Sequence, residues 1–280
     1  MLKPPQELIK RALEEDGAHD DVTTLSTVAE TNQSTARIIT RQAGVVAGLF
    51  VVAETFRLLD ERVMVELLVR DGAAVQPGET LARLAGPSRA LLSGERVALN
   101  FLGRLSGIAS LTAQCVRAIE GTQARILDTR KTMPGLRSLE KYAVLMGGGQ
   151  NHRFGLSDGI LIKDNHIKAA GSIAQAVAAA RRAAPHLLKV EVECETLAEV
   201  EQALAAGADV VLLDNMPHIL MRNAVELIRQ RAPYVLIEAS GGIGTDPSHL
   251  AAVAATGVDF ISLGALTHSA PHFDISLEFD

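Results

Sequence analysis

The second half of the chain, from about residue 111, alternates short apolar runs with longer amphipathic stretches. The apolar runs have the length of buried strands and occupy residues 125–127, 160–162, 190–192, 210–213, 235–237 and 260–263. Helical patterns lie between the later runs, at residues 172–184, 197–206, 221–231 and 247–256. The last four runs recur at intervals of roughly 20 to 25 residues, and strand–helix–strand alternation at this spacing predicts βαβ units and a parallel sheet.

Six predicted strands are fewer than a complete (β/α)₈ barrel contains. By pattern alone, an incomplete barrel and an open doubly wound sheet both remain open. Gly207 and Gly257 follow two of the predicted helices, at positions where glycine commonly ends a helix. In either architecture, ligands bind at the carboxyl ends of the parallel strands.

The first hundred residues have mixed patterns without this repeat. Apolar periodicity predicts helices at residues 8–15 and 88–105, and β-type runs predict strands at residues 34–40 and 63–70. Arg96 lies on the second helix, close to its apolar stripe. Two interpretations stay open for Arg96: a long side chain that covers apolar surface, or one that is directed at a ligand or a second subunit.

The composition restricts the class of protein. The chain has 280 residues, of which 48% are hydrophobic and 21% charged, as is ordinary for a soluble enzyme of one or two domains. Only 3% are aromatic, so stacking on nucleic-acid bases is poorly supported. The pI of about 5.8 also disfavours a phosphate-backbone binder, and we expect no nucleic-acid partner.

The sequence predicts neither secretion nor membrane insertion. Residues 1–16 lack the uninterrupted apolar stretch of a signal peptide. The longest apolar segment, residues 44–56, is too short to span a bilayer and contains Glu54. Cys115 and Cys194 form no CxxC pair and give no disulfide framework, which favours a reducing compartment. We therefore expect a cytoplasmic protein.

One segment, residues 128–166, differs in charge from the rest of the chain. Residues 125–168 contain eight Lys or Arg against four Asp or Glu, a net charge of +4, whereas the whole chain has a net charge of −6. The segment also contains the run Gly147-Gly148-Gly149. Cationic side chains hold carboxylates and phosphates, and glycine lets backbone N–H groups approach them. A small, highly charged anion is therefore the expected ligand.

Polar residues follow nearly every predicted strand of the second half. They are Asp128 to Lys131, Lys163 to His166, Glu193 to Glu195, Asp214-Asn215, Glu238 to Gly242, and Gly264. Because the carboxyl ends of parallel strands meet at one mouth, we expect one site to be surrounded by Arg130, Lys163, Glu193, Asp214 and the turn from Ser240 to Gly242. Strand alternation also puts Glu191 and Glu193 on the same face, and carboxylates buried there would need basic partners or a metal ion.

These strand-end residues also have purely structural interpretations, as a helix cap, a solvated strand end, an ion pair, a tight turn or surface residues. Asp214 would cap a helix, Lys163 would be a solvated strand end, and Glu191 with Glu193 would form ion pairs. Ser240 to Gly242 would be a tight turn, and the group His152, Arg153 and His166 would be helix-cap or surface residues. Each alternative is reasonable by itself. All of them together at six successive strand ends are much less so, which favours a ligand site.

Two of the carboxylates suggest a metal ion. Glu193 and Asp214 beside several cations suit Mg²⁺ bridging a polyphosphate, because Mg²⁺ prefers one or two carboxylates plus substrate oxygens. The glycine run is neither a P-loop nor a dinucleotide-binding fingerprint, because GxxxxGK[ST] and GxGxxG are both missing.

The chain resembles the quinolinate phosphoribosyltransferases, the carboxylating nicotinate-nucleotide pyrophosphorylases. The matching segments follow the order of that family over nearly the full length, and DTRKT-PG with NHR and KDNHI is a very specific combination. The segments are HDDVTT (19–24), GERVALNFLGRLSGIAS (94–110), DTRKTMPGLRSLEKYAV (128–144), GGGQNHRFGLSDGILIKDNHI (147–167), VEVECET (190–196), LLDNM (212–216), EASGGI (238–243) and ISLGALTHS (261–269).

The resemblance implies a glycosyltransferase (pentosyltransferase) reaction of NAD biosynthesis. Quinolinate and phosphoribosyl pyrophosphate, with Mg²⁺ and no organic cofactor, would give nicotinate mononucleotide, pyrophosphate and CO₂. The implied fold is an open α/β sandwich, residues 1–110 with 268–280 returning to it, and an incomplete TIM-like α/β barrel, residues 111–267. The resemblance also implies a homodimer with a shared active site; a higher oligomer stays open.

The resemblance also implies roles for individual residues. Quinolinate carboxylates would be bound by Arg130, His152 and Arg153, and by Arg96 across the dimer interface. The 5′-phosphate would lie in a cradle made by Ser240, Gly241, Gly242 and the turn from Ser262 to Gly264. Thr129 belongs to the same substrate site. The expected catalytic residues are Lys131 and Lys163, near the reacting centre or the phosphates, and Glu193 and Asp214, which would position the ribose and Mg²⁺-pyrophosphate.

Three other functions compete with this one. A molybdenum-transport-associated relative of the same fold would lack the stretch Lys163-Asp164-Asn165-His166, which is present here. A Schiff-base aldolase could use Lys163 at a strand end. A ligand sensor that has lost catalysis would not be expected to keep Arg130, Lys163, Glu193 and Asp214 together. Many bacterial relatives have Arg-Cys or a similar pair where this chain has Leu145-Met146, and no chemistry in the sequence depends on that difference.

Overall fold

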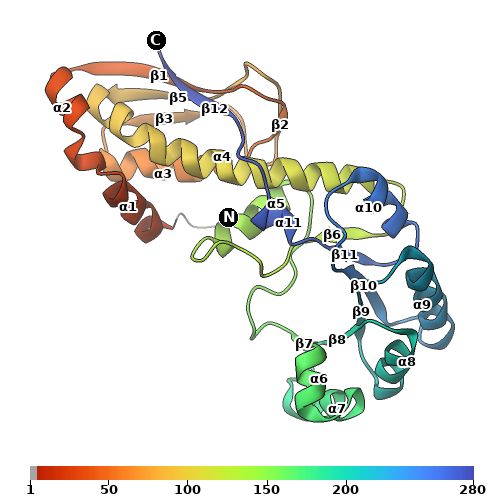
Figure 1. Cartoon of the computed structure of the whole chain (residues 1–280). Helices are drawn as coiled ribbons and strands as arrows, with labels where there is room; N and C mark the ends of the chain where they lie inside the picture. The colour runs from red at the N-terminus through yellow and green to blue at the C-terminus, as the bar shows by residue number, and fades with distance from the viewer. Residues whose placement is uncertain (1–4) are drawn as a thin grey trace. The chain divides into compact units, whose positions relative to one another are not determined.

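The structure is a computed structural model that describes residues 5–280, and the chain divides into two compact units (Figure 1). The first unit contains the chain up to residue 113 together with residues 133–148 and 270–280. The second contains residues 114–132 and 149–269. The boundaries predicted from the sequence put the whole of residues 111–267 in one domain, whereas here residues 133–148 group with the first unit.

The first unit is built on an antiparallel sheet in the order β12-β1-β5-β3, with a separate pair β2-β4. The strands are β1 (Gln33–Thr40), β2 (Gly44–Val45), β3 (Met64–Leu67), β4 (Ala74–Val75), β5 (Thr80–Pro87) and β12 (Ile275–Phe279). β12 pairs with β1, Ala36 opposite Phe279, so the end of the chain completes the edge of the first sheet.

The helices of the first unit pack against this sheet. The apolar core of the unit includes Phe56, Leu84, Leu91 and Phe273. They are α1 (Gln6–Glu15), η1 (Ala18–Asp20), α2 (Val22–Thr27), α3 (Leu49–Leu59), α4 (Ser88–Ala118) and α5 (Arg137–Met146). The apolar segment 44–56, in which no helix was predicted, forms most of α3. Its buried residues lie on nearly every side, so it has little amphipathic signal.

Two further differences from the sequence predictions concern α4 and α5. α4 continues past residue 105 to Ala118, because the residues beyond, such as Ile108 and Ala109, are also fully buried. α5 groups with the first unit through polar contacts. The buried Glu140 carboxylate accepts a hydrogen bond of 2.7 Å from Arg104, and the Tyr142 hydroxyl donates one of 2.7 Å to Asp71.

The second unit is a six-stranded sheet in the order β6-β11-β10-β9-β8-β7, and every recorded strand pair is parallel. Its strands are β6 (Arg125–Leu127), β7 (Ile160–Ile162), β8 (Val190–Cys194), β9 (Val210–Asp214), β10 (Leu236–Ser240) and β11 (Phe260–Ser262). All six lie where the apolar runs predicted them. The fold class, an α/β sandwich with an incomplete α/β barrel, is confirmed.

Helices alternate with these strands (Figure 1). They are α6 (Asp164–Ala170), α7 (Ile173–Ala183), α8 (Leu197–Ala206), α9 (His218–Arg231), α10 (Pro247–Ala254) and the short α11 (Ala265–His268). Gly207 ends α8 with a φ of 82°, the left-handed conformation that favours glycine, as predicted. Among residues 5–280, no helix combines the length and the apolar character needed to cross a bilayer.

Candidate active site

The carboxyl ends of the parallel strands surround a pocket of about 780 Å³ that lies entirely in the second unit. This volume is within the range of small-molecule sites. The lining residues that were predicted from the sequence are Thr129, Arg130, Lys131, His152, Arg153, Lys163, Glu193, Asp214, Ser240, Gly241, Gly242, Ser262 and Gly264. The strand-end argument correctly brought together Arg130, Lys163, Glu193, Asp214 and the turn from Ser240 to Gly242, whereas His152 and Arg153 were expected from the family resemblance.

One wall of the pocket is cationic. Arg130 and Lys131 follow β6, and Arg153 lies in the segment that leads to β7. The Arg153 guanidinium donates a hydrogen bond of 2.8 Å to the carbonyl oxygen of Gly159, which holds the side chain in place. Burial and the neighbouring charge of Arg130 lower the pKa of Arg153 from its ordinary value. The positive charges of the two guanidinium groups repel each other, and a bound anion would relieve this repulsion. The two side chains therefore form a site for an anion.

A salt bridge joins the ends of β7 and β8. The Lys163 ammonium donates to a carboxylate oxygen of Glu193, whose side chain is 12% exposed. Glu191 and Glu193 both point to the inner face of the sheet, as the alternation of residues in this strand predicted. Lys163 and Glu193 therefore supply one positive and one negative group to the same part of the pocket.

Asp214 ends β9 and is held by its neighbours. The side-chain amide of Asn215 donates a hydrogen bond of 2.6 Å to Oδ2 of Asp214. Asn215 has a φ of 52°, a left-handed conformation that asparagine tolerates better than most residues. Asp214 does not cap α9, which begins after Pro217 without a side-chain cap. The helix-cap interpretation of Asp214 is therefore wrong, and its carboxylate belongs to the pocket.

Gly241 lies directly against these two residues. It has a φ of +81°, and a Cβ atom there would be 2.5 Å from Oδ1 of Asn215 and 2.6 Å from Oδ1 of Asp214. Both the backbone conformation and the close approach therefore require glycine. The turn after β10 is thus packed against the end of β9, so the two strand ends form one continuous wall.

The substitution Gly241→Ala is expected to lower the free energy of unfolding by about 1–3 kcal/mol, because the new methyl group overlaps two oxygen atoms in addition to straining the backbone. Urea denaturation measures this loss. Gly121→Ala is the matched control, since Gly121 has nearly the same φ, +82°, but nothing within 4 Å of the added Cβ. Equal losses in the two variants would show that contact with Asp214 and Asn215 has no effect.

The turns after β10 and β11 form the remaining wall. The Ser262 hydroxyl donates a hydrogen bond of 3.0 Å to the Ser240 hydroxyl, which ties the two strand ends together. A Cβ atom at Gly264 would be 2.9 Å from Cδ of Lys131, so the Lys131 stem lies across this glycine. Glycine-rich turns that expose backbone N–H groups beside a lysine suit the binding of phosphate.

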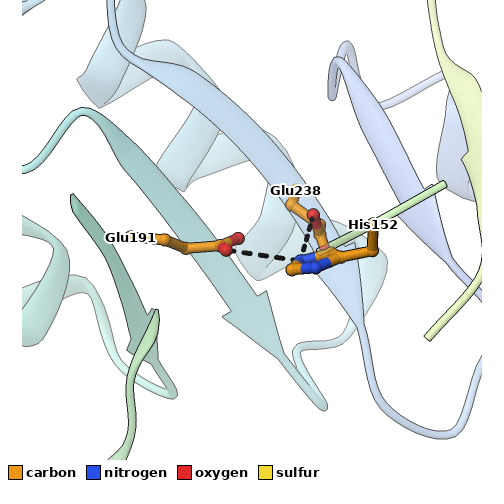
Figure 2. A group of neighbouring side chains, drawn as sticks. All are labelled: His152, Glu191 and Glu238. Carbon is orange, nitrogen blue, oxygen red and sulfur yellow. Dashed lines mark ion pairs between the residues drawn. The ribbon is translucent and has the colours of Figure 1, made fainter. Parts of the chain in front are cut away.

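Beneath the cationic wall lies a buried cluster of His152, Glu191 and Glu238 (Figure 2). Nε2 of His152 is 3.3 Å from Glu191 and 3.5 Å from Glu238. One oxygen of each carboxylate, Oε1, is buried without a hydrogen-bond partner among the described residues. Burial, and then the charge of Glu191, raises the pKa of Glu238 to about 8. Both causes favour the neutral carboxyl group over the carboxylate.

The backbone fixes the tautomer of the His152 ring. The N–H of Arg153 donates a hydrogen bond of 2.7 Å to Nδ1 of His152, and the N–H of His152 donates one of 2.8 Å to the buried Asp128. Burial lowers the pKa of His152, but the hydrogen bond to Glu191 and the nearby carboxylate charges outweigh it, so the pKa is raised. Because Nδ1 accepts a hydrogen bond, the ring proton lies on Nε2, facing both carboxylates.

This tautomer decides between two uses of the cluster. Candidate ligand atoms of the three side chains all lie within 4.8 Å of one another, a spacing that could also fit a metal ion. A metal-binding imidazole needs a lone pair on the nitrogen that faces the ion. Here Nε2 carries the proton and Nδ1 faces the backbone, so the arrangement favours a proton-sharing cluster. Glu193 and Asp214 are the better candidates for Mg²⁺, because both are half-buried oxygen donors that face the pocket.

Two residues of interest lie outside the pocket. Arg96 belongs to α4 in the first unit and its side chain is exposed in the single chain. An exposed head group agrees with both interpretations of Arg96, which stay predictions. His166 accepts a hydrogen bond of 3.0 Å from the backbone N–H of Lys163 at the start of α6, which agrees with its interpretation as a helix cap.

Some lining residues were not predicted. Asn215 and Glu238 belong to quoted motifs but were not assigned to the site, and the others are Leu161, Leu212, Ile243, Gly244, Ala265 and His268. The sequence could have indicated Glu238 as a site residue, because a glutamate within an apolar strand must find a polar partner. The small and apolar lining residues could not have been predicted from the sequence, since the same residue types occur throughout the sheet.

Comparisons with known proteins agree over the whole chain. The family models described as the N-terminal and C-terminal domains of quinolinate phosphoribosyl transferase match residues 21–106 and 108–278. A Bacillus subtilis protein named probable nicotinate-nucleotide pyrophosphorylase [carboxylating] is 48% identical over 98% of this chain and 92% of its own length. The human nicotinate-nucleotide pyrophosphorylase [carboxylating] is 42% identical over 90% of this chain and 84% of its own length.

Solved structures agree with the sequence relatives. The structure of the nicotinate-nucleotide pyrophosphorylase from Francisella tularensis superposes with a TM-score of 0.91. It is 40% identical, and the match covers 99% of this chain and 98% of that one. A likeness of this extent includes both units and every strand that supplies a pocket residue.

Proposed function

The chain belongs to the quinolinate phosphoribosyl transferase family, and on that premise we propose that it catalyses the carboxylating nicotinate-nucleotide pyrophosphorylase reaction. Quinolinate and phosphoribosyl pyrophosphate give nicotinate mononucleotide, pyrophosphate and CO₂, a step of NAD biosynthesis. The observation that supports this most strongly is a single pocket that combines a cationic wall, a carboxylate pair and glycine-rich turns.

The cationic wall fits quinolinate, a dianion. Arg130 and Arg153 can each bind a carboxylate through paired N–H groups. Their mutual repulsion, which lowers the pKa of Arg153, would be relieved by the bound dianion. His152 lines the same wall, but its Nε2–H faces Glu191 and Glu238. We therefore assign the carboxylate contacts mainly to the two arginines, and to His152 a supporting position beside them.

The opposite wall fits phosphoribosyl pyrophosphate. The turns at Ser240 to Gly242 and Ser262 to Gly264 offer hydroxyl and backbone N–H donors for the 5′-phosphate. Lys131 lies across Gly264 and adds a positive charge there. Thr129 orders this segment, because its hydroxyl accepts a hydrogen bond of 3.1 Å from the N–H of Lys131.

The carboxylates Glu193 and Asp214 lie where the sugar would react. When pyrophosphate leaves the anomeric carbon, positive charge develops on the ribose, and preorganised carboxylates stabilise it. Asn215 fixes the Asp214 carboxylate, and Lys163 fixes that of Glu193. Lys163 also balances the negative charge of the phosphates when they approach. The two fixed pairs therefore supply opposite charges without reorganisation during the reaction.

We propose that Glu193 and Asp214 also hold Mg²⁺ together with the pyrophosphate oxygens. Two carboxylates in one pocket match the preference of Mg²⁺ for oxygen ligands shared with a phosphorylated substrate. When bound, the ion would neutralise the leaving pyrophosphate. No organic cofactor is needed for the loss of CO₂, because the quaternised ring nitrogen stabilises the electron pair left on the adjacent carbon.

We further propose a cytoplasmic location. Cys115 and Cys194 are both buried and free. Burial raises the pKa of the Cys115 thiol to about 11 and that of Cys194 to about 12, so both are unreactive structural thiols. Unlinked, protonated cysteines suit a reducing compartment.

Arg96 would complete the site from a second subunit, in a homodimer or a higher oligomer. Its exposed position on α4 is compatible with that role. Arg96→Ala and Arg130→Ala should each be nearly inactive alone. After random subunit exchange, their mixture should regain about a quarter of the wild-type activity, because half of the dimers then contain one site with both arginines. A mixture that stays inactive after exchange, verified by mass spectrometry, would place Arg96 in its own chain's site.

The direct test of the function is incubation with quinolinate, phosphoribosyl pyrophosphate and Mg²⁺, following nicotinate mononucleotide and pyrophosphate. We expect turnover with quinolinate, none with nicotinate in its place, and none when a chelator removes Mg²⁺. Absence of turnover with all three components would refute the proposed reaction. Turnover that persists in the chelator would refute the role of Mg²⁺ alone.

A Schiff-base aldolase that uses Lys163 has less support. Nζ of Lys163 is engaged by Glu193, whereas a Schiff base requires a free amine that attacks a carbonyl carbon. Borohydride should therefore trap no carbonyl substrate on Lys163.

A further inference from the structure

The proposed reaction consumes a proton, and the cationic residues described above do not explain its source. When the bond between C2 of quinolinate and its carboxylate breaks, CO₂ leaves and the electron pair stays on C2. Nicotinate mononucleotide has a C–H bond at that carbon, so a proton must reach it. A general acid beside the carboxylate-binding wall would supply this proton directly to the carbon.

Glu238 is placed for this task. It projects from the middle of β10, lines the pocket, and is only 3% exposed. It lies beside His152, which directly precedes Arg153 in the chain. Carboxylates bound by Arg130 and Arg153 would place the pyridine ring in the pocket that Glu238 also lines. Glu238 is thus close to the expected position of C2.

The neighbours of Glu238 keep its carboxyl group protonated. Glu191 from β8 and His152 from the segment before β7 face it, and the Ser262 hydroxyl from β11 also lies against it. Burial raises the pKa of Glu238 most, and the charge of Glu191 raises it further, whereas His152 and Ser262 lower it. The balance favours the neutral acid.

Unpartnered oxygens give independent evidence of a proton in the cluster. Oε1 of Glu191 and Oε1 of Glu238 are both buried with no partner in the part of the chain that the structure describes. Two bare carboxylates at this separation would repel each other and leave two acceptors unsatisfied. A proton on Glu238 removes one negative charge and turns one of the two acceptors into a donor.

We propose that Glu238 is the general acid that protonates C2 of the pyridine ring as CO₂ leaves, an inference that rests on the proposed function. The C2–carboxylate bond breaks, and its electron pair takes the carboxyl proton of Glu238 to form the C2–H bond. Glu238 is left as a carboxylate and regains a proton from solvent when the products leave. Each turnover consumes one proton, and no oxidant or reductant is required.

The other acids of the pocket are less suitable. Nε2–H of His152 is directed at the two carboxylates, and its Nδ1 is occupied by the Arg153 backbone. Lys163 is paired with Glu193, beside the proposed ribose position. The Lys131 stem lies across Gly264, in the proposed phosphate region. A lysine donor is the main alternative, and the test below distinguishes it.

The test is Glu238→Gln, which keeps the shape and hydrogen bonding of the side chain but removes the acidic proton. Pyrophosphate and CO₂ are measured separately in single and multiple turnovers. We expect a burst of about one pyrophosphate per site, with CO₂ and nicotinate mononucleotide formed about 100-fold more slowly than by the wild type. KM for quinolinate should change little. Pyrophosphate and CO₂ that fall equally, or not at all, would overturn the proposal.

The pH profile gives a second, independent readout. Since the acid must be protonated, wild-type kcat should fall as the pH rises through the pKa of Glu238, and Glu238→Gln should lack this decline. Glu191→Gln removes the charge that raises this pKa, so its decline should begin at a lower pH. Circular dichroism shows whether Glu238→Gln folds, and if it does not, Glu191→Gln is the deciding variant. A decline of kcat that begins at a lower pH in Glu191→Gln supports Glu238 as the acid. A decline at the wild-type pH indicates a lysine and overturns the proposal.

The two hypotheses fail in different ways. A wild-type enzyme that releases neither pyrophosphate nor CO₂ refutes the proposed function itself. A wild-type enzyme that turns over, with Glu238→Gln releasing CO₂ at the same rate, leaves the function intact and refutes only the role of Glu238.

Discussion

Replacement of Arg130 by alanine is expected to lower kcat/KM for quinolinate by about 30-fold or more, which corresponds to at least about 2 kcal/mol of transition-state stabilisation. Arg130 is the first strongly basic residue after β6 and lies beside Arg153 on the cationic wall. A paired guanidinium–carboxylate contact in a half-buried pocket is among the stronger polar interactions available to a protein.

The loss should exceed that of one hydrogen bond for a further reason. Quinolinate must approach phosphoribosyl pyrophosphate, which is itself strongly anionic, and their repulsion is reduced only by the cations around them. Without Arg130, the cationic wall loses one of its two guanidinium groups. KM for quinolinate should therefore rise and kcat should fall together, whereas KM for phosphoribosyl pyrophosphate should change less.

Two further variants make this result specific. Arg125→Ala removes an exposed arginine from the amino end of the same strand, away from the pocket, and should leave kcat/KM near the wild-type value. Arg130→Lys keeps the charge but not the paired N–H groups, and should recover only part of the activity. An Arg130→Ala enzyme with unchanged kcat/KM for quinolinate would exclude a role for Arg130 in binding this substrate.

Replacement of Glu193 by glutamine is expected to lower kcat by about 100-fold with little change in KM for quinolinate. The effect falls on kcat because the carboxylate stabilises charge that develops only as the bond between ribose and pyrophosphate breaks. Glutamine keeps the size of the side chain but not its charge, and it leaves Lys163 without its ionic partner. The same substitution removes one of the proposed Mg²⁺ ligands, so the Mg²⁺ concentration for half-maximal activity should increase.

Glu195→Gln is the matched control for Glu193→Gln, because Glu195 is exposed two residues further along the chain and does not line the pocket. Its kcat and Mg²⁺ dependence should equal those of the wild type. If Glu193→Gln mainly raised KM for quinolinate and left kcat unchanged, Glu193 would belong to the quinolinate site instead of the ribose site.

Most strands and helices of the second unit could be predicted from the regular alternation of apolar runs and amphipathic stretches in the sequence. Short apolar runs of fixed spacing can hardly form anything except buried parallel strands joined by helices, because both faces of such a sheet are covered. Gly207 ended α8 as predicted, since its left-handed conformation excludes most other residues. The first unit was less predictable, because α3 is apolar on nearly all sides and such a segment does not reveal its helical period.

The pocket was predictable to a similar extent and for a related reason. Every parallel strand of a βαβ unit ends at the same edge of its sheet, so Arg130, Lys163, Glu193 and Asp214 had to meet once the strands were correctly identified. The roles of individual residues could not be read in this way. Whether Asp214 capped a helix or faced the pocket depended on the turn at Asn215 and Pro217, which local sequence leaves undetermined.

The sequence by itself determined the class of fold, the family and the set of charged groups around one mouth, because hydrophobic periodicity and strand direction are local properties of the chain. Only the tertiary structure decided that Glu191, Glu238 and His152 form one buried cluster, because their three segments are far apart in sequence. It also decided which ring nitrogen of His152 carries the proton, since that depends on the Arg153 N–H and two carboxylates from different strands. Burial and the charge of a neighbour set the protonation of Glu238, and both arise only when distant segments pack together.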